Sequence, residues 1–344
     1  MRTIASTDHA LHFPKGELSG GEFVRPFECP ERWEYIVRAL TDSGFSAPEA
    51  PAALDMTSVA KIHGDDYLRF LAQAWSLWEA DGFSGEAIPT VFPARRMRQR
   101  EPDHIDAKLG YFAMALETAI TPGTWQAVQS SAACAQTAAR LLGPSDSSAF
   151  ALCRPPGHHA GIDLYGGYCF INNAALAAQE LLDAGASRVA ILDVDFHHGN
   201  GTQDIFYLRD EVLFLSLHGD PQRAFPNFLG YADETGHGAG EGFNANYPMP
   251  EGTGYAVWAD ALSHALRRIT HYTPDALIVS LGVDTFERDP ISFFKLRCDD
   301  FTDYGRTIGR QTASIPTLFV MEGGYAVEEI GINTRNVLSG FLGA

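Results

Sequence analysis

The stretch Arg188-Val-Ala-Ile-Leu-Asp-Val-Asp-Phe-His-His-Gly-Asn-Gly-Thr202 decides the fold class. It begins as an apolar, β-branched run, which is typical of a parallel strand buried on both faces. Asp195 and His197 follow where this strand ends, and side chains two positions apart on extended backbone point the same way. A buried carboxylate at that point needs a partner, because an isolated buried charge is costly. A divalent metal is the first candidate for that partner.

Length and charge narrow the class of protein. The 344 residues are long for one domain, but a large α/β domain reaches this size. With 25 basic and 43 acidic residues, the formal net charge is −18, which argues against nucleic acid or an anionic membrane as a partner. Such a surface would attract small cationic ligands, although a merely solvated acidic surface explains the charge equally well. The five scattered cysteines, the lack of a secretory signal and the lack of a long apolar segment predict a cytoplasmic protein with no membrane partner.

Apolar runs alternate with amphipathic helical segments through most of the chain. The expected strands are Thr3–Ala5, Ser148–Cys153, Val189–Val194, Val212–Leu217, Ala276–Leu281 and Pro316–Met321. The expected helices are Asn172–Ala184, with Asn173 and Gly185 as caps, Tyr255–Thr270, Tyr304–Ala313 and Glu328–Leu342, preceded by a helical region at about Asp103–Leu142. This order predicts a single α/β domain over residues 1–344, with three layers and a central, mostly parallel sheet flanked by helices.

One segment, Gly82–Ile105, departs from this alternation and is rich in Pro, Gly and Arg. A loop of this length in a compact domain is usually either functional or disordered. It is also the most basic segment of an acidic chain. The segment is therefore predicted to be either an arm for self-association or a solvated surface loop.

Ligands of parallel α/β sheets bind at the carboxyl ends of the strands, and five of the expected strands end on a reactive or aromatic side chain. Asp195, His197 and Asp284 form a set of three oxygen and nitrogen ligands, which leaves a coordination position open, as in a catalytic metal site. These ligand types suit Zn²⁺, with Fe²⁺ or Mn²⁺ as alternatives. Turn chemistry would explain either aspartate alone, but not the whole set.

Acid–base and oxyanion-stabilising groups follow two more strands. His158 and His159 stand behind a proline-rich turn, and histidine suits proton transfer because its ordinary pKa lies near the working pH. Asp193 and Asn200 are in position to orient these imidazoles. Tyr325, after two glycines, supplies a phenol that can donate to an oxyanion, although packing at a turn explains a tyrosine there as well. The other histidines, such as His63, His104, His237, His264 and His271, are expected to be surface or capping residues.

Five motifs in combination resemble the histone deacetylase family. They are Arg154-Pro-Pro-Gly-His-His-Ala, Gly167-Tyr-Cys-Phe-Ile-Asn-Asn173, Asp193-Val-Asp-Phe-His-His-Gly-Asn-Gly-Thr-Gln203, Leu281-Gly-Val-Asp284 and Glu322-Gly-Gly-Tyr325. Within that family the chain is most similar to the bacterial acetylpolyamine amidohydrolases, including across Gly82–Ile105. The resemblance implies the arginase/deacetylase fold and one Zn²⁺ per chain, held by Asp195, His197 and Asp284.

The resemblance also implies roles for the other site residues. His159 would be general base and acid, His158 its electrostatic partner and Tyr325 the group that polarises the carbonyl, so that a metal-activated water attacks an acetamide. Asp193 would pair with His158, and Asn200 with His159. Structural K⁺ or Na⁺ ions are implied at Asp193, Asp195, His197, Ser216 and Leu217, and at Phe206, Arg209, Val212 and Phe243.

The substrate implied by the resemblance is a small cationic acetylated polyamine or diamine. The long loop would build a homodimer that narrows the entrance to the site. The implied substrate-binding residues are Asp106, Glu117, Gly167, Tyr168, Phe225 and Ile291. Ordinary packing would also explain the aromatic side chains of Tyr168 and Phe225. Three alternatives stay open: a deacylase of acetyl-lysine peptides or of another small amide, a non-catalytic metal-binding protein, and a ureohydrolase, which would need two metals.

Overall fold

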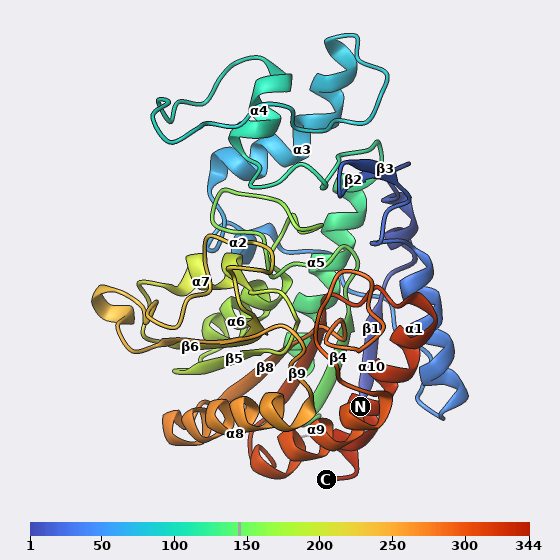
Figure 1. The fold of residues 1–344 in the computed structure, drawn as a ribbon, viewed down its shortest axis with the longest axis vertical. Coiled ribbons are helices and arrows are strands. Elements are labelled where there is room, and N and C mark those ends of the chain that lie inside the picture. The colour runs from blue at the N-terminus through green and yellow to red at the C-terminus, as the bar shows by residue number, and fades with distance from the viewer. Residues whose placement is uncertain (144–145) are drawn as a thin grey trace.

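A computed structural model describes residues 1–143 and 146–344, and its core is a seven-stranded sheet (Figure 1). The strand order is β1 (Arg2–Ala5), β4 (Ser148–Leu152), β9 (Thr317–Met321), β8 (Ala276–Leu281), β5 (Val189–Asp193), β6 (Val212–Gly219) and β7 (Asn244–Met249). Every neighbouring pair in this sheet is parallel. β2 (Glu17–Ser19) and β3 (Glu22–Val24) form a separate antiparallel hairpin.

Helices cover both faces of the sheet. One face carries α2 (Met56–Val59), α5 (Thr124–Leu141), α6 (Asn173–Asp183) and α7 (Asn200–Phe206). α3 (Asp65–Ala80) and α4 (Ile105–Tyr111) lie beyond the sheet at one end of the molecule (Figure 1), and their apolar side chains extend the same core. The other carries α1 (Glu31–Asp42), α8 (Tyr255–Tyr272), α9 (Cys298–Gln311) and α10 (Val327–Leu342). The predicted three-layer α/β architecture is therefore confirmed. Among the described residues, no helix combines the length and the apolar character needed to cross a bilayer.

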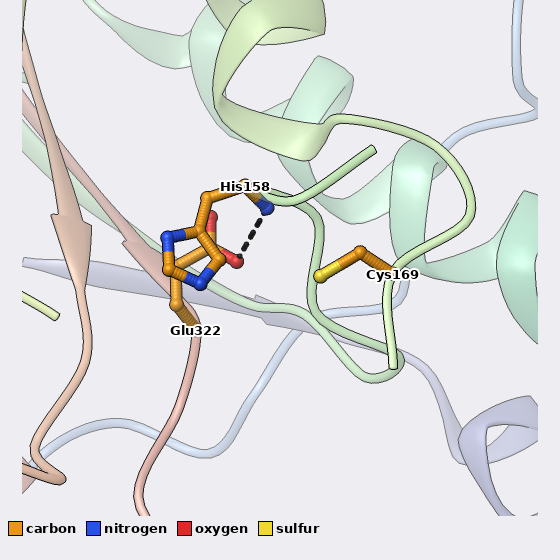
Figure 2. A group of neighbouring side chains, drawn as sticks. All are labelled: His158, Cys169 and Glu322. Atoms are coloured by element: carbon orange, nitrogen blue, oxygen red, sulfur yellow. Dashed lines mark hydrogen bonds between the residues drawn. The ribbon is translucent and has the colours of Figure 1, made fainter. Parts of the chain in front are cut away.

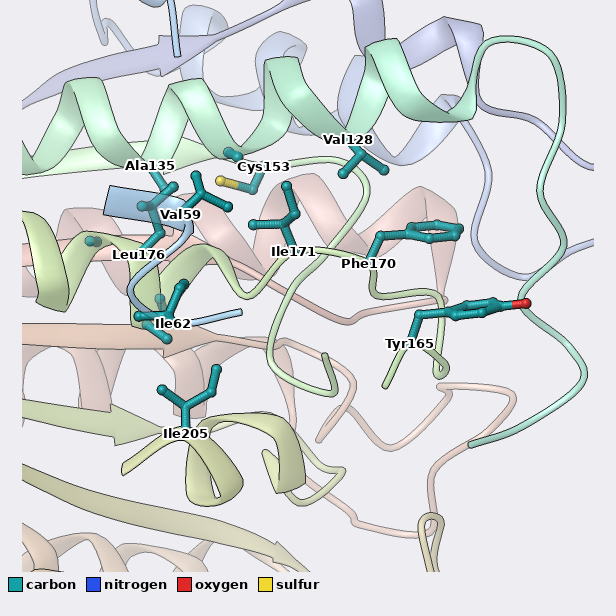
Figure 3. Close-up of a cluster of buried hydrophobic side chains, with 14 of the residues drawn as sticks. Val59, Ile62, Val128, Ala135, Cys153, Tyr165, Phe170, Ile171, Leu176 and Ile205 are labelled. Carbon is teal, nitrogen blue, oxygen red and sulfur yellow. The ribbon is translucent and has the colours of Figure 1, made fainter. Parts of the chain in front are cut away.

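Two hydrophobic cores fill the spaces between the layers. Alternate residues of each strand supply them: Ile191 of β5 belongs to the core under α5 and α6, and Leu192 to the core under α8 and α9. Figure 3 shows part of the first core, where side chains of α2, α5, α6 and α7 meet. Burial on both faces explains why these strands are continuous apolar runs rather than alternating ones.

The structure corrects the predicted caps and bounds of two helical regions. Asn172, not Asn173, caps α6, because its side chain accepts a hydrogen bond from the N–H of Ala175 at 2.9 Å. Asn173 instead donates to the carbonyl of Pro155. Two adjacent asparagines are equivalent in sequence, and only their tertiary contacts separate them. The region at Asp103–Leu142 is two helices, α4 and α5, with a non-helical connection over residues 112–123.

Several elements were not predicted. β7 is interrupted by Asn244, Asn246 and Pro248, so it lacks the apolar run of its neighbours, yet it pairs with β6 over six residues. The hairpin of β2 and β3 has a recognisable signal, since Gly20 and Gly21 form the two-residue turn between short strands. α1, α2 and α3 lie within the first 100 residues, where β1 was the one element predicted.

The segment Gly82–Ile105 connects α3 to α4 and lies with them at one end of the molecule (Figure 1). It is tied to the domain by hydrogen bonds between the backbones of Ala87 and Ile120, at 3.0 and 2.9 Å. From Ala94 to Arg100 every residue is exposed, and four of these seven are arginines. The loop is thus anchored at its base and presents positive charge at its tip.

Candidate active site

The ends of four adjacent strands place their side chains at one point of the sheet. β4, β9, β8 and β5 are neighbours in space, although they are far apart in the chain. They are followed by His158 and His159, by Tyr325, by Asp284 and by Asp195 and His197, respectively. All of these residues are at most 7% exposed. The sheet order thus produces the convergence that the strand ends predicted.

Asp195, His197 and Asp284 form a compact group that could hold a metal ion. One ligand atom of each lies within 4.8 Å of the others, and all three residues are buried. The Nδ1 atom of His197 is 3.0 Å from Oδ2 of Asp284 and 3.3 Å from Oδ1 of Asp195. The peptide N–H groups of Gly323 and Phe196 donate to the remaining carboxylate oxygens, at 2.7 and 2.8 Å, and so fix both carboxylates.

The electrostatics of this group fit a bound cation. Burial alone would lower the pKa of His197, but the carboxylates of Asp195 and Asp284 raise that pKa to about 10. Burial also raises the pKa of Asp284 well above its ordinary value, with the nearby Asp195 as the next cause. The site therefore stabilises positive charge at the centre of the three side chains. The oxygen and nitrogen donors match the preferences of Zn²⁺ and related ions.

The two adjacent histidines have opposite electrostatic properties. Burial opposes protonation of His158, yet Asp195 and Asp193 raise its pKa to about 10, with Oδ2 of Asp193 accepting from Nδ1 at 3.0 Å. Burial, together with the positive charges of His158 and His197, lowers the pKa of His159 well below its ordinary value. The Nδ1–H of His159 donates to Oδ1 of Asn200 at 2.7 Å. A carbonyl oxygen can only accept, so Nε2 of His159 keeps its lone pair.

A second group of potential ligands, His158, Cys169 and Glu322, lies beside the first (Figure 2). Glu322 uses one carboxylate oxygen to accept from the N–H groups of Gly157 and His158, at 2.7 and 3.1 Å. Burial raises the pKa of the Cys169 thiol well above its ordinary value, so the thiolate that a metal needs is disfavoured. With Nδ1 of His158 engaged by Asp193, this group orders the loop after β4 rather than forming a second metal centre.

Buried charges that were not predicted hold the loop bearing Tyr325. The N–H of Tyr325 donates to the carboxylate of Asp289 at 2.7 Å. Arg32, at the start of α1, donates to the carbonyls of Gly324, at 2.7 Å, and Glu322, and its guanidinium lies 5.0 Å from the centre of the Tyr325 ring. Glu28 pairs with Arg32 at 2.8 Å. No local sequence pattern reveals the contacts of Arg32 with these two carbonyls, because they join residues 292 and 290 positions apart.

A cavity of about 250 Å³ leads to these groups. His159, His197 and Tyr325 lie at its base, with Gly167, Tyr168, Phe225 and Ile291 among its walls. The ring of Phe225 stands edge-on to that of His159, with centres 5.0 Å apart. Gly167 has a φ of +56°, and a β-carbon there would collide with the His159 imidazole, which explains the glycine.

Two carboxylates line this cavity. Glu117 was predicted, and its Oε1 accepts from the N–H of Gly167 at 2.7 Å. Glu17, in the hairpin of β2 and β3, was not predicted, and it accepts from the hydroxyl of Tyr168 at 3.0 Å. Asp106 lies on α4, and it is not among the described residues that line the cavity of the single chain.

The residues predicted for structural monovalent cations fall into two places. Asp193, Asp195, His197, Ser216 and Leu217 lie at or just beyond the carboxyl ends of the paired strands β5 and β6. Phe206, Arg209, Val212 and Phe243 lie around the end of α7 and the start of β6, where backbone hydrogen bonds join Arg209 to Phe206 and Phe214 to Phe243. These ion sites stay predictions.

One histidine assigned to the surface is in fact internal. His63 is 3% exposed, its Nδ1–H donates to the carbonyl of Gly161 at 2.7 Å, and its Nε2 accepts from the N–H of Asn172 at 3.0 Å. It therefore fastens the loop after β4 to the cap of α6. The short segment around it gave no signal of this burial.

Comparison with known proteins agrees with this geometry. The family model described as the histone deacetylase domain matches residues 26–341. The chain is 58% identical over 343 residues to the acetylpolyamine amidohydrolase of Mycoplana ramosa, with 100% of both covered. It is 53% identical to acetylpolyamine amidohydrolase 2 of Pseudomonas aeruginosa, covering 100% of this chain and 99% of that protein. The crystal structure of an acetylpolyamine aminohydrolase from Burkholderia pseudomallei matches with a TM-score of 0.92 at 39% identity, over 99% of this chain and 98% of that one.

A more distant structure, the HD domain of HDA15, matches with a TM-score of 0.82 at 26% identity, over 100% of this chain and 91% of that one. The match of the family model, the full-length relatives and the clustered site residues point the same way. This chain is a member of the histone deacetylase family, and thus an enzyme that hydrolyses amide bonds.

Proposed function

We propose that this enzyme is a zinc-dependent amidohydrolase that removes the acetyl group from N-acetylated polyamines and diamines such as acetylputrescine, acetylcadaverine and acetylspermidine. The observation that carries the proposal is the cavity of about 250 Å³, which is lined by His159, His197 and Tyr325 and also by two carboxylates, Glu17 and Glu117. A slender chain with an acetamide at one end and an ammonium group at the other fits that distribution of charge. The names of the full-length relatives support the same substrate class.

Asp195, His197 and Asp284 would hold the zinc ion. When bound, zinc would supply Lewis-acid polarisation of the acetamide carbonyl and would lower the pKa of water. Two carboxylates and one imidazole leave a coordination position open for these tasks.

The protein's own groups would move the protons. His159, whose pKa is lowered by burial and by its charged neighbours, has a free Nε2 that can take a proton from the attacking water. It can then pass that proton to the departing amine. His158 has a pKa of about 10 and stays charged, which favours the negative charge that develops during attack. The Tyr325 hydroxyl would donate to the oxyanion.

The same geometry suits acetyl-lysine, whose side chain is also slender, so a peptide deacylase is the second candidate. The Gly82–Ile105 loop would favour the polyamine if it forms a homodimer contact that restricts the entrance, and Asp106 on the neighbouring α4 would then join the substrate site. The five cysteines are free thiols, and four of them are buried, which supports a cytoplasmic location.

A turnover comparison tests the proposal. The zinc-loaded enzyme should release acetate from acetylputrescine, acetylcadaverine or acetylspermidine with a higher kcat/KM than from an acetyl-lysine peptide. Removing the metal with a chelator should abolish turnover, and adding Zn²⁺ should restore it. Loss of turnover in the Asp284→Asn variant, with the metal content reduced in the same preparation, would support the ligand assignment. Higher kcat/KM on the peptide would favour the second candidate, and no acetate release from any polyamine would exclude the proposal.

A further inference from the structure

A second cavity lies beside α8, at the end of β5 opposite to the candidate active site. Its volume is about 580 Å³, within the range of small-molecule binding sites. It is lined by Arg188, Leu213, Gly242, Phe243, Tyr247, His264, Arg267, Arg268, His271 and Tyr272. Arg188 directly precedes β5 and Asp195 follows it, so about 20 Å of extended chain separates the two cavities.

The charge of this lining is opposite to that of the whole chain. Its three arginines are positively charged, and none of the described lining residues is acidic, although the formal net charge of the protein is −18. Two histidines also line it, and Nε2 of His264 lies 3.8 Å from the carboxylate of Asp260. Arg188 lies over the ring of Tyr272, with its guanidinium carbon 5.5 Å from the ring centre. Arg268 donates to the carbonyl of Gly242 at 2.8 Å. Within the described parts of the chain, Arg188, Arg267 and Arg268 form no ion pair with a carboxylate.

Three acidic residues near Tyr272 do not cancel this charge. The Asp275 carboxylate accepts from the N–H groups of Ser187 and Arg188, at 2.7 and 3.0 Å. Glu211 pairs with Arg209 at 2.7 Å. Asp210 contacts the Tyr272 hydroxyl through its backbone carbonyl, at 3.0 Å. Two of the three carboxylates thus have partners of their own, and none of them lines the cavity.

Aromatic rings complete the cavity wall. The rings of Phe243 and Tyr272 meet edge to face, with centres 5.8 Å apart. Tyr247 lies beside the guanidinium groups of Arg267 and Arg268. Planar guanidinium groups suit the bidentate binding of phosphate oxygens, and ring faces suit the stacking of a planar base.

We propose that this cavity binds a phosphorylated ligand that carries an aromatic ring, of the nucleotide class, at a site distinct from the active site. Arg188, Arg267 and Arg268, which form no ion pair among the described residues, would bind the phosphate groups. Phe243, Tyr247 and Tyr272 would contact the ring. This combination distinguishes the cavity from the candidate active site, whose walls carry carboxylates and suit cations.

Calorimetric titration of the zinc-loaded enzyme tests the site, with ADP, inorganic phosphate and adenosine as probes. ADP should bind once per chain, phosphate more weakly and adenosine not measurably, and added salt should weaken the ADP affinity. The double variant Arg188→Gln/Arg267→Gln should lose at least tenfold in ADP affinity. Arg310→Gln, an exposed change of the same kind on α9, should not.

Two results would overturn this site. They are no ADP binding at millimolar concentration, and ADP affinity that is unchanged in the double variant. The double variant should keep the parent's melting temperature and deacetylation rate, since both side chains are exposed and remote from the catalytic groups. Its deacetylation rate is measured separately, so failure of this site and failure of the proposed function are distinguishable.

Discussion

The Tyr325 hydroxyl is the group whose contribution to turnover is easiest to isolate. Burial raises the pKa of this phenol well above its ordinary value, so it stays protonated and can donate. Tyr325→Phe removes one oxygen and keeps the ring against Arg32. We expect kcat to fall by about 10²- to 10³-fold, the usual effect of losing one oxyanion donor, while metal content and melting temperature stay unchanged.

Tyr165→Phe is the matched control for that change. Tyr165 is fully buried, its hydroxyl has no hydrogen-bond partner among the described residues, and it does not line the active-site cavity. Its loss should leave kcat close to that of the parent. Turnover of Tyr325→Phe within about threefold of the parent would contradict the role of the phenol as an oxyanion donor.

We expect Glu17 to make the affinity for a cationic substrate depend on pH. Burial raises the pKa of Glu17 to about 7, opposed by hydrogen bonds from Tyr168 and Phe27, and assisted by the nearby carboxylates of Glu117 and Glu28. Glu17 is therefore neutral below pH 7 and negatively charged above it. The ammonium group of acetylputrescine stays charged throughout this range, so its attraction to the cavity should increase as pH rises.

We expect the KM for acetylputrescine to fall about three- to tenfold between about pH 6 and pH 8, the effect of gaining one partly screened charge pair. Glu17→Gln should remove that dependence. Dividing the KM of the parent by the KM of Glu17→Gln at each pH cancels the effect of all other titrating groups. Equal slopes in parent and variant would show that Glu17 does not meet the cation.

Local spacing decides which site residues the sequence can predict. Asp195 and His197 were predicted because they directly follow one apolar strand and are two positions apart. Glu17 and Asp289 were not, because their relation to the site depends on contacts with Tyr168 and Tyr325, at positions distant in the chain. Residue chemistry at the strand ends suggested proton transfer for His158 and His159 and oxyanion donation for Tyr325. The resemblance added the division of roles, with His159 as general base and acid and His158 as its electrostatic partner.

Among the elements, α1 acts on the site through its first turn. Arg32 is 2% exposed and joins Glu28 of the preceding loop to two carbonyls of the loop that bears Tyr325. Arg32→Met should lower the free energy of unfolding by about 2–4 kcal/mol, because buried acceptors lose their donor while Glu28 keeps its pairing with Arg154. It should also lower kcat, since Tyr325 loses its support.

Urea denaturation and steady-state kinetics measure the two effects of Arg32→Met. Arg38→Met, on the exposed side of the same helix, is the control, and it should change the free energy of unfolding by less than about 0.5 kcal/mol. Equal stability of the two variants would mean that the buried contacts of Arg32 are energetically neutral. A kcat of Arg32→Met equal to that of the parent would show that α1 does not position Tyr325.

At the same scale, continuity of hydrophobic pattern decided which elements could be predicted. β5, β8 and β9 are unbroken apolar runs buried on both faces, and their positions were correct within two residues. β7 is an edge strand with polar Asn244 and Asn246, whose side-chain NH2 groups donate to Gln203 and to backbone carbonyls of a neighbouring loop. Such a strand exists through tertiary pairing, which its own sequence does not encode.

For the whole molecule, the basic loop tip sets an expectation about assembly. The arginines between Ala94 and Arg100 are exposed, while the chain as a whole carries a formal net charge of −18. Docking of this tip onto an acidic surface of a second copy would bring opposite charges together. We expect the parent to sediment as a dimer in analytical ultracentrifugation at low salt, and Arg96→Glu/Arg98→Glu, which reverses two of these charges, to sediment as a monomer.

The same loop variant tests whether assembly sets substrate choice. If the partner narrows the entrance and brings Asp106 to the substrate, the monomer should lose kcat/KM on acetylspermidine and gain it on an acetyl-lysine peptide. Arg38→Glu/Arg310→Glu changes the net charge by the same amount away from the loop, and should alter neither property. If the loop variant becomes monomeric but still prefers acetylspermidine to the peptide, substrate selectivity does not depend on the partner and resides within one chain. Glu17, Glu117 and the walls formed by Tyr168 and Phe225 would then suffice to select the polyamine.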